Sequence, residues 1–264
     1  MLYSHNLKKL FLGLLLLCGS VCAAQSPTLW YKFDEGTGST ANDSSGNGYT
    51  GTWTGTKSCS GQYYFSPGKI GPYAGCFNGS DAQVAANANH SYSGTSGVTT
   101  ISCWIYVVTA PVTNYVGIVN IAPSTYADAF KLGFGPYSSI GTSTHSTMGI
   151  STGNGTSPYG VAVFTNSIQI GVWMYLAAVY DGTGITAYLN GVVTDYKIVS
   201  GPAGGTSDPL VIGNDTDGAS RFFDGYIDDV RIYNSVLTAS QIYGIYAAGA
   251  PIGSGGNTPY GYAK

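Results

Sequence analysis

Charge is scarce in this sequence, and it has no basic cluster outside the N-terminus. Asp, Glu, Lys and Arg make up 9% of the 264 residues. Without the adjacent Lys8 and Lys9, the 10 Lys and Arg fall to 8 against 13 Asp and Glu, a net charge of about −5. Nucleic acids and anionic membranes bind clustered positive charge, so the sequence predicts neither as a partner. A surface rich in neutral Gly, Ser, Thr and Tyr suits sugars and extracellular matrices instead.

The sequence also lacks the spacings that zinc sites and serine hydrolases require. Beyond the N-terminal Cys18 and Cys22, no pair among its Cys and His residues has the spacing of a zinc site. Residues 149–153 read Gly-Ile-Ser-Thr-Gly and formally match a nucleophile elbow. The α/β-hydrolase order needs a histidine after the serine, whereas His5, His90 and His145 all precede Ser151. We therefore interpret the match as chance in a chain rich in Gly and Ser.

Long apolar runs are missing after the first 24 residues. Lys8 and Lys9 precede an apolar run from Leu10 to Leu17, and small residues follow up to Ala24. This pattern predicts a secretory signal peptide over residues 1–24, with a lipoprotein attached through Cys18 as the weaker alternative. The run is about half of the roughly 20 residues that span a bilayer, so no membrane insertion is expected. We predict a secreted, extracellular or cell-surface protein, with the periplasm as an alternative.

Cysteines are few, and their number is odd once the leader is removed. Cys18 and Cys22 belong to the leader, so Cys59, Cys76 and Cys103 remain. Cys59 and Cys76 lie in a turn-rich stretch, and an oxidising exported environment favours a disulfide between them. Cys103 lies in an apolar strand pattern and is predicted to be a buried free thiol.

What the sequence has in abundance is short strand patterns. Runs rich in Val, Ile, Tyr, Thr and Phe recur between Gly, Asn, Asp and Pro clusters, which is typical of an all-β protein. Asn190-Gly191 is a strong hairpin signal and, with Asp-Gly at residues 181–182, predicts a three-stranded meander. The expected strands are 29–33, 98–107, 115–121, 130–134, 160–164, 174–180, 185–189, 192–198, 210–212 and 225–233.

Only one helix is expected, and it lies near the C-terminus. It runs over residues 238–247, with Thr238 as its N-cap and an end near Gly249. No composition shift divides the chain after the leader. We therefore predict a signal peptide at 1–24, one domain at 25–249 and a flexible tail at 250–264.

Four stretches, in order, resemble a known family. They are LWYKFDEGTGSTANDSSGNGYTGT, VTTISCWIYV, WMYLAAVYDGTGITAYLNG and LVIGNDTDGASRFFDGYIDDVRIYNSVLTASQIYGIY, and they span roughly residues 28–249. Together they resemble the laminin-G-like jelly-roll domains of the concanavalin A-like lectin and glucanase superfamily. The resemblance implies a two-sheet antiparallel jelly-roll β-sandwich with one short C-terminal helix.

The resemblance also implies a structural calcium ion. Strict alternation along residues 227–233 would place Asp228 on the same face as Val230 and Ile232, where a carboxylate needs a cation or several donors. The family often supplies a carboxylate from this strand to calcium, so Asp228 and Asp43 are the expected metal ligands. The alternative is that Asp43 caps its turn and Asp228 or Asp229 pairs with Arg231 or a backbone amide. Residues 214–218, Asn-Asp-Thr-Asp-Gly, are interpreted as an exposed turn.

The acids that a glucanase needs are not in the expected place. Retaining enzymes use two carboxyl groups about 5 to 5.5 Å apart, and the family's hydrolases carry two glutamates around an aspartate on a middle strand. Here residues 106–173 contain Asp128 as their one acid, and Glu35 is the only glutamate of the chain. The sequence therefore predicts a protein that is not an enzyme of this kind.

Loop aromatics supply material for sugar recognition, in which a ring stacks on the apolar face of a sugar and polar groups bond its hydroxyls. Trp104 and Trp173 lie in strand patterns and are expected to pack in the interior. The ligand-binding candidates outside those patterns are Trp53, Tyr63, Tyr64, Tyr126, Tyr137 and Tyr159, with Asn114, Asp128 and Asn154 as polar partners.

Three functions compete at this point. The first is a secreted, non-catalytic carbohydrate-binding or adhesion module, stabilised by calcium, whose partner is a glycan or an extracellular matrix component. The second is a structural surface or matrix protein that self-associates. The third is a divergent glycoside hydrolase. Fold alone does not decide between them, because one fold hosts many functions.

Overall fold

Two antiparallel sheets make up most of the computed structural model, which describes residues 25–57, 59, 63–87, 98–109, 116–121, 130–135, 148–152, 160–164, 169–198, 210–215 and 221–250. One helix accompanies the strands in these residues. The prediction of an all-β chain with one short helix is therefore confirmed. The expected signal peptide and residues 251–264 of the expected tail lie outside the described residues.

The first sheet, called sheet A, has the spatial order β14-β13-β12-β7-β16-β5-β4, and β1 also pairs with β16. Its strands are β1 (Leu29–Tyr31), β4 (Phe65–Pro67), β5 (Tyr73–Asn78), β7 (Thr99–Val107), β12 (Trp173–Tyr180), β13 (Gly184–Leu189), β14 (Val192–Ile198) and β16 (Asp224–Tyr233).

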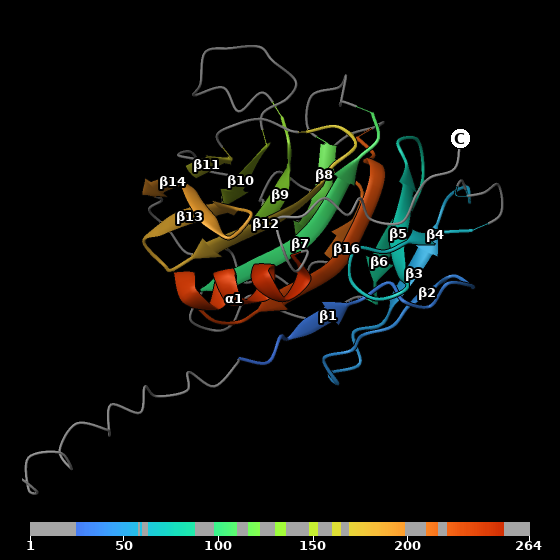
Figure 1. Cartoon of the computed structure of the whole chain (residues 1–264), viewed down its shortest axis with the longest axis horizontal. Helices are drawn as coiled ribbons and strands as arrows, with labels where there is room; N and C mark the ends of the chain where they lie inside the picture. The colour runs from blue at the N-terminus through green and yellow to red at the C-terminus, as the bar shows by residue number, and fades with distance from the viewer. Residues whose placement is uncertain are drawn as a thin grey trace, which may run out of the picture.

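The second sheet, called sheet B, has the order β11-β10-β9-β8-β15-β6-β3-β2. Its strands are β2 (Thr40–Ala41), β3 (Gly51–Thr54), β6 (Gln83–Ala86), β8 (Val116–Ile121), β9 (Phe130–Phe134), β10 (Met148–Thr152), β11 (Gly160–Phe164) and β15 (Leu210–Ile212). In Figure 1, β2 to β6 lie together at one end of the sandwich. These strands and β10 were not predicted from the sequence.

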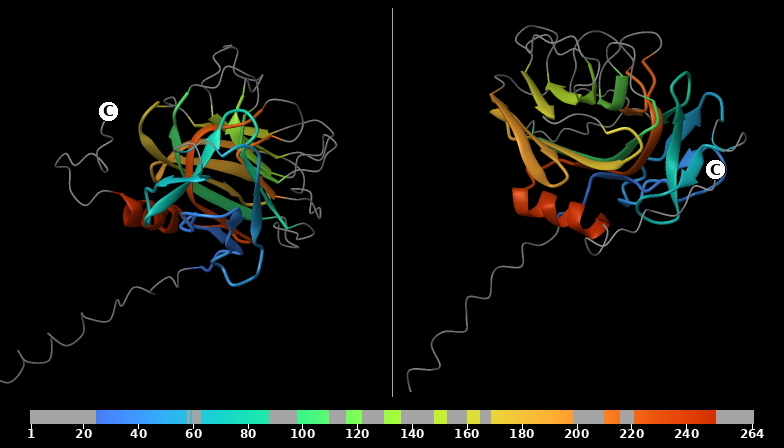
Figure 2. Two further views of the ribbon diagram at one scale, coloured as in Figure 1. Left: turned by 90° about the vertical axis from the view of Figure 1, so that its right-hand side faces the viewer. Right: turned by 45° about the horizontal axis from the view of Figure 1, so that its top comes forward.

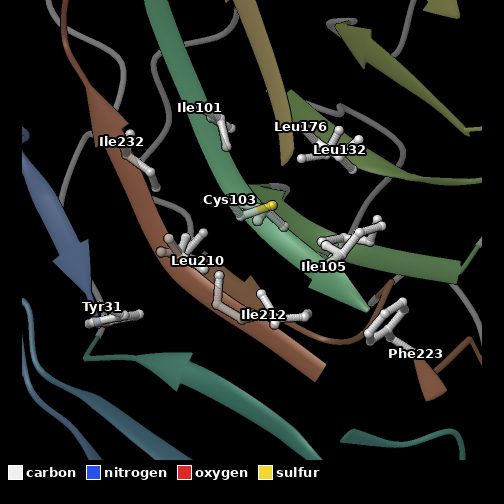
Figure 3. Packing of buried hydrophobic residues seen from close by; sticks show 14 of the residues in the cluster. Tyr31, Ile101, Cys103, Ile105, Leu132, Leu176, Leu210, Ile212, Phe223 and Ile232 are labelled. Atoms are coloured by element: carbon white, nitrogen blue, oxygen red, sulfur yellow. The ribbon is translucent and has the colours of Figure 1, made fainter. Parts of the chain in front are cut away.

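The sheets pack face to face, and one hydrophobic core fills the space between them. Ile101, Cys103 and Ile105 of β7 belong to the same buried cluster as Leu132 of β9 and Leu210 of β15. Figure 3 shows these side chains gathered between strands of the two sheets. Alternate residues of a strand point to opposite faces, so the even-numbered residues of β7 point away from sheet B. We call this side the outer face of sheet A.

The predicted meander is confirmed. Strands β12, β13 and β14 are consecutive neighbours in sheet A. Both hairpin residues have left-handed backbone angles, with φ of 51° at Asn190 and 78° at Gly191, which a two-residue hairpin of this kind requires. The Asn190 side chain also accepts a hydrogen bond from the Tyr175 N–H at 2.9 Å, so it ties the turn to β12.

A bulge in β16 overturns the alternation expected for this strand. Its register with β7 shifts between Asp228 and Arg231, and Asp229 has a φ of 52°. The bulge inserts an extra residue, so Ile227, Val230 and Ile232 all enter the core. Asp228 lies directly opposite Trp104 and shares its outer face. The prediction that Asp228 shares the face of Val230 and Ile232 is therefore wrong.

The C-terminal helix α1 (Ala239–Gly249) packs on the outer face of sheet A, on the side away from sheet B (Figure 2). Thr238 is its N-cap, as predicted: its hydroxyl accepts from the Gln241 N–H, and the Gln241 side chain accepts from the Thr238 N–H. This reciprocal pair is a capping box. No helix of the described residues is both long and apolar enough to cross a bilayer.

The cysteines behave as expected. Cys59 and Cys76 form a disulfide, with their Cα atoms 6.1 Å apart, although Cys76 lies in strand β5 and not in a turn. Cys103 is a free thiol with no exposed surface. Burial raises the pKa of this thiol, and the negative charge of Asp229 raises it further.

The burial of Cys103 predicts that its thiol is inert in the folded protein. The thiolate is the reactive form, and both the raised pKa and the packing oppose it. We expect iodoacetamide at pH 8 to leave the Cys103 peptide unlabelled in native protein and to label it fully in guanidinium chloride, as measured by peptide mass spectrometry. Full labelling of Cys103 under native conditions would show that the core described above is open.

Candidate functional site

Two of the aromatic residues predicted to bind a ligand are buried. Trp53 lies in β3 with 3% of its surface exposed, and it stacks on Tyr64 with ring centroids 4.8 Å apart. Tyr64 is 5% exposed, and its hydroxyl donates to the Gly55 carbonyl at 2.6 Å. Neither ring has a face free for a sugar. The interpretation of Trp53 and Tyr64 as loop residues open to a ligand is therefore wrong, because both belong to the core.

The other predicted ligand-binding residues are not brought together in the described structure. Tyr63 is 45% exposed, and its backbone pairs with Cys59 beside the disulfide. The remaining candidates all lie outside the described residues: Asn114, Tyr126, Asp128, Tyr137, Asn154 and Tyr159.

A different set of aromatic side chains gathers on the outer face of sheet A. Tyr106 of β7 lies directly opposite Trp173 of β12 on one side and Tyr226 of β16 on the other. The ring centroids are 5.6 Å apart for Tyr106 and Trp173, 5.4 Å for Tyr106 and Tyr226, and 6.4 Å for Trp173 and Tyr226. All three side chains are partly exposed. We call Tyr106, Trp173 and Tyr226 the aromatic platform.

Helix α1 explains why this row of side chains is accessible while the next row is not. The neighbouring row lies two positions further along the same three strands. It consists of Tyr175, Trp104 and Asp228. Tyr246 of α1 stacks on Trp104 with centroids 5.7 Å apart and contacts Tyr175 at 6.0 Å. The expectation of packing is confirmed for Trp104, which is fully covered, but Trp173 is only partly buried against the helix cluster.

A groove of about 280 Å³ runs beside the aromatic platform. It is lined by Tyr106, Val107, Val108, Ile170, Gly171 and Tyr226. Residues 170 and 171 are held against the end of β7, because the Gly171 N–H donates to the Val107 carbonyl at 2.9 Å. Val108 and Ile170 are 44% and 56% exposed.

The predicted metal ligand Asp43 holds its own turn together. One carboxylate oxygen accepts from the N–H groups of Trp30 and Ser45 at 3.0 and 2.9 Å, and the other accepts from the Ser45 hydroxyl and the Tyr49 N–H at 2.8 and 3.0 Å. Burial would raise the pKa of Asp43, but these hydrogen bonds outweigh it and lower the pKa below its ordinary value. This is the turn-capping alternative that the sequence left open.

The predicted metal ligand Asp228 is fully buried and binds a different part of the chain. Its Oδ2 accepts from the backbone N–H groups of Lys69 and Ile70 at 2.7 and 2.8 Å, while Oδ1 has no hydrogen-bond partner in the described residues. Burial raises the pKa of Asp228 to about 8, although the two N–H donors oppose the shift. Asp229 instead pairs with Arg231 at 2.9 Å and accepts from the Trp30 indole at 2.7 Å.

These contacts do not fit the calcium site that the family resemblance implies. Calcium takes 6 to 8 oxygen ligands, whereas both oxygens of Asp43 already face hydrogen-bond donors. Oδ1 of Asp228 has no hydrogen-bond partner in the described residues. The Lys69 side chain lies near enough to interact electrostatically with the Asp228 carboxylate. Within the described residues no three Asp, Glu, His or Cys side chains gather at a point where they could hold a metal.

The acids and the serine motif show no catalytic arrangement in the described residues. One oxygen of Glu35 accepts from the Asn42 N–H at 2.7 Å, which ties the glutamate to its own loop. Asp228 and Asp229 are buried at 0% and 2% exposure and do not reach a solvent-filled groove. Ser151 lies within the paired strand β10, whereas a nucleophile elbow is a sharp turn from strand to helix.

The Asn-Asp stretch at 214–215 is not the exposed turn that was expected. Asn214 and Asp215 are 8% and 5% exposed. Asp215 forms ion pairs with Lys131 at 3.0 Å and Arg221 at 3.4 Å, and the Asn214 side chain donates to Gln83 at 2.8 Å. The prediction is wrong for these two residues because their side chains bridge separate strands; residues 216–218 lie outside the described part.

Comparison with known families agrees with the fold. The family model described as the concanavalin A-like lectin/glucanases superfamily, of laminin-G type, matches residues 77–243. No curated protein matches the sequence.

Solved structures of similar fold include domain 4 of AbnA, a GH43 extracellular arabinanase from Geobacillus stearothermophilus, in complex with arabinotriose. It is 24% identical, with 84% of this chain and 98% of that chain covered and a TM-score of 0.63. The receptor-binding domain of botulinum neurotoxin C/D mosaic serotype is 16% identical, with 84% and 51% covered and a TM-score of 0.63. The binding domain of botulinum neurotoxin DC in complex with rat synaptotagmin II is 15% identical, with 85% and 52% covered and a TM-score of 0.61.

The match thus spans nearly all of the arabinanase domain but about half the length of the toxin domains. At these identities the likeness shows the fold alone. The jelly-roll sandwich expected from the sequence is thereby confirmed.

The burial of Trp53 predicts a large loss of stability when it is truncated. Replacing a buried Trp with Ala leaves a cavity and costs about 3–5 kcal/mol. We therefore expect Trp53→Ala to lower the urea midpoint strongly. Tyr63→Ala, the control at an exposed ring, should change the free energy of unfolding by no more than about 0.5 kcal/mol. A wild-type urea midpoint for Trp53→Ala would contradict its place in the core.

Proposed function

Because the chain belongs to the concanavalin A-like lectin/glucanases superfamily, we propose that it is an exported, non-catalytic module that binds carbohydrate through the aromatic platform. Export is supported by the leader pattern of residues 1–24 and by the Cys59–Cys76 disulfide, since disulfides persist in oxidising compartments. The observation that carries the binding proposal is the row of three partly exposed rings on Trp173, Tyr106 and Tyr226.

The geometry of the aromatic platform suits the apolar face of a sugar. Its rings come from three neighbouring strands and lie next to one another at interplanar angles of 60°, 38° and 36°, so they form one contiguous, uneven aromatic surface. Strands hold side chains more rigidly than loops do, and a preformed surface loses little freedom on binding. Tyr and Trp also combine an apolar ring with a polar group that can remain hydrated. A sugar ring, with C–H groups on one face and hydroxyls around its edge, has the complementary character.

The solved structures support the same function by analogy. The arabinanase domain of similar fold is in complex with arabinotriose, and the toxin domain of similar fold is a receptor-binding domain. Within the described residues, the lining of the groove contains no Asp or Glu. The groove therefore does not hold the pair of carboxyl groups that a retaining glycosidase uses.

The alternative of a structural protein that associates with copies of itself has less support. Edge strand β14 exposes several apolar side chains, among them Val193, Tyr196 and Ile198, and exposed edges favour pairing between chains. Side chains of β14, however, already bond to the neighbouring edge strand β11: the Val163 N–H donates to Asp195 at 2.9 Å, and the Thr194 hydroxyl donates to the Val163 carbonyl at 3.4 Å. Part of the free edge is therefore covered.

The carbohydrate proposal predicts that truncating one ring of the aromatic platform weakens glycan binding. A glycan array should first identify ligands of the wild-type protein. We expect Trp173→Ala and Tyr226→Ala to weaken binding to them by about tenfold or more, since loss of one stacking ring removes about 1.4 kcal/mol. Isothermal titration would measure the affinities, and thermal melts would establish that each variant is folded.

Tyr196→Ala is the matched control, because Tyr196 is a 49% exposed tyrosine on β14, outside the aromatic platform. It should bind as the wild type does. If the wild-type protein binds no glycan on the array, the carbohydrate proposal fails. If Tyr196→Ala loses binding while the platform variants keep it, the ligand lies elsewhere on sheet A.

Calcium stabilisation remains a separate prediction of the family resemblance, and a thermal melt tests it. A ligand that binds only the native state raises stability. Because the oxygens of Asp43 face donors and Asp228 has one free oxygen, we expect the same Tm in EDTA and in excess calcium. A Tm that falls in EDTA for the wild type, but not for Asp228→Asn, would instead establish Asp228 as a calcium ligand.

A further inference from the structure

We propose that the groove beside the aromatic platform takes a methyl-bearing substituent of the sugar that stacks on the platform, such as the methyl group of a 6-deoxyhexose or of an N-acetylated hexose. The inference rests on the proposed function and names the ligand class for the same site. Tyr106 and Tyr226 belong to both the aromatic platform and the lining of the groove. A sugar stacked on these rings therefore directs one of its substituents into the groove.

The groove offers a sugar hydroxyl few side-chain partners besides the hydroxyls of Tyr106 and Tyr226. Two backbone N–H groups beside it are already paired: the Val108 N–H donates to the Asp224 carbonyl at 3.1 Å, and the Gly171 N–H donates to the Val107 carbonyl at 2.9 Å. Apart from the two tyrosine hydroxyls, the lining side chains are the aliphatic groups of Val108 and Ile170, because the side chain of Val107 is fully buried in the core.

This lining discriminates between hydroxyl and methyl substituents. A hydroxyl that leaves water without gaining a hydrogen-bond partner loses free energy. A methyl group that enters the same space gains it, because its apolar surface is removed from water. The lining also carries no charge, so it gives no compensation for removing a charged sugar from water. The groove therefore favours a neutral sugar with a methyl-terminated substituent.

The size of the groove favours a small substituent over a protein partner. A volume of about 280 Å³ lies just below the roughly 300–1,000 Å³ of sites that enclose whole drug-sized ligands. A stable protein interface instead buries about 800 Å² on each partner. The groove therefore has room for the methyl-bearing substituent and an adjoining part of the sugar, but not for a protein interface.

Paired sugars that differ at one substituent test the inference. We would titrate the wild-type protein with 6-deoxygalactose against galactose, and with N-acetylglucosamine against glucose, and follow binding by saturation-transfer difference NMR. In a pair that binds, the methyl-bearing sugar should bind about fourfold more tightly, the gain from burying one methyl group. Its methyl protons should receive the strongest saturation.

Two groove variants locate the preference. Val108→Thr and Ile170→Thr place a hydroxyl in the groove at positions that are 44% and 56% exposed, so the fold should tolerate them. We expect each to reduce the fourfold preference toward equality. Val193→Thr, a similar change at a 49% exposed valine on β14, is the matched control and should leave the preference unchanged.

The outcomes separate this inference from the proposed function. Equal binding of both members of each pair overturns the groove assignment and leaves carbohydrate binding standing. A methyl preference that survives both groove variants also overturns the assignment, because the methyl group then binds elsewhere. If no sugar in these pairs and no glycan on the array binds, the proposed function fails and the inference fails with it.

Discussion

The pairing of β16 with β7, and the bulge that interrupts it, sets the arrangement of the whole outer face of sheet A. β16 pairs with β7 along most of its length, and with β5 and β1 on its other side. Before the bulge, Tyr226 and Asp228 lie opposite Tyr106 and Trp104. The bulge at Asp229 then restores the apolar residues Val230 and Ile232 to the core. Without the bulge, strict alternation would place Asp228 on the same face as Val230 and Ile232. Either the carboxylate would then enter the core, or the two apolar residues would lie on the outer face.

Helix α1 divides that face into a covered part and an open part. Tyr246 and Ile242 of the helix close over Trp104 and Tyr175, whereas the aromatic platform lies one row further along the same strands. The covered row retains polar atoms with no partner in the described residues, namely the Trp104 indole N–H, the Tyr175 hydroxyl and Oδ1 of Asp228. Unpaired buried polar atoms cost free energy, so the packing of the aromatic rings must offset that cost. The same strands thus supply a second interior and an open row of aromatic side chains.

Much of the fold could be predicted from the sequence, because its signals are local. Asn-Gly at 190–191 fixed the meander, and Thr238 with Gln241 marked the start of the helix. The short strands between residues 40 and 86 were missed, since runs such as Gln83–Ala86 are too short to show a period. The bulge at Asp229 was missed because strict alternation was assumed, although Ile227 and Val230 are three residues apart and so break the period of two that Val230 and Ile232 keep.

The candidate site was harder to predict, because exposure depends on what covers a strand. Trp104 and Tyr106 are two residues apart in β7, as are Trp173 and Tyr175 in β12, so the sequence does show that each pair shares a face. Nothing local reveals that α1 covers Trp104 and leaves Tyr106 partly open. Trp53 was predicted to be exposed and is buried. Its strand has only four residues, so the sequence resembled a loop, but its ring packs in the core.

Several of the few acids in this chain are engaged in contacts within the scaffold. Asp43 holds a turn with four hydrogen bonds, Asp229 is paired with Arg231, and Asp215 is paired with Lys131 and Arg221. Asp228 anchors the backbone at Lys69 and Ile70. The acids of the scaffold therefore stabilise the fold, and none of them lines the groove beside the aromatic platform. Within the described residues, the lining of the groove is therefore aromatic and aliphatic, and the side chains of the acids named above serve contacts elsewhere in the scaffold.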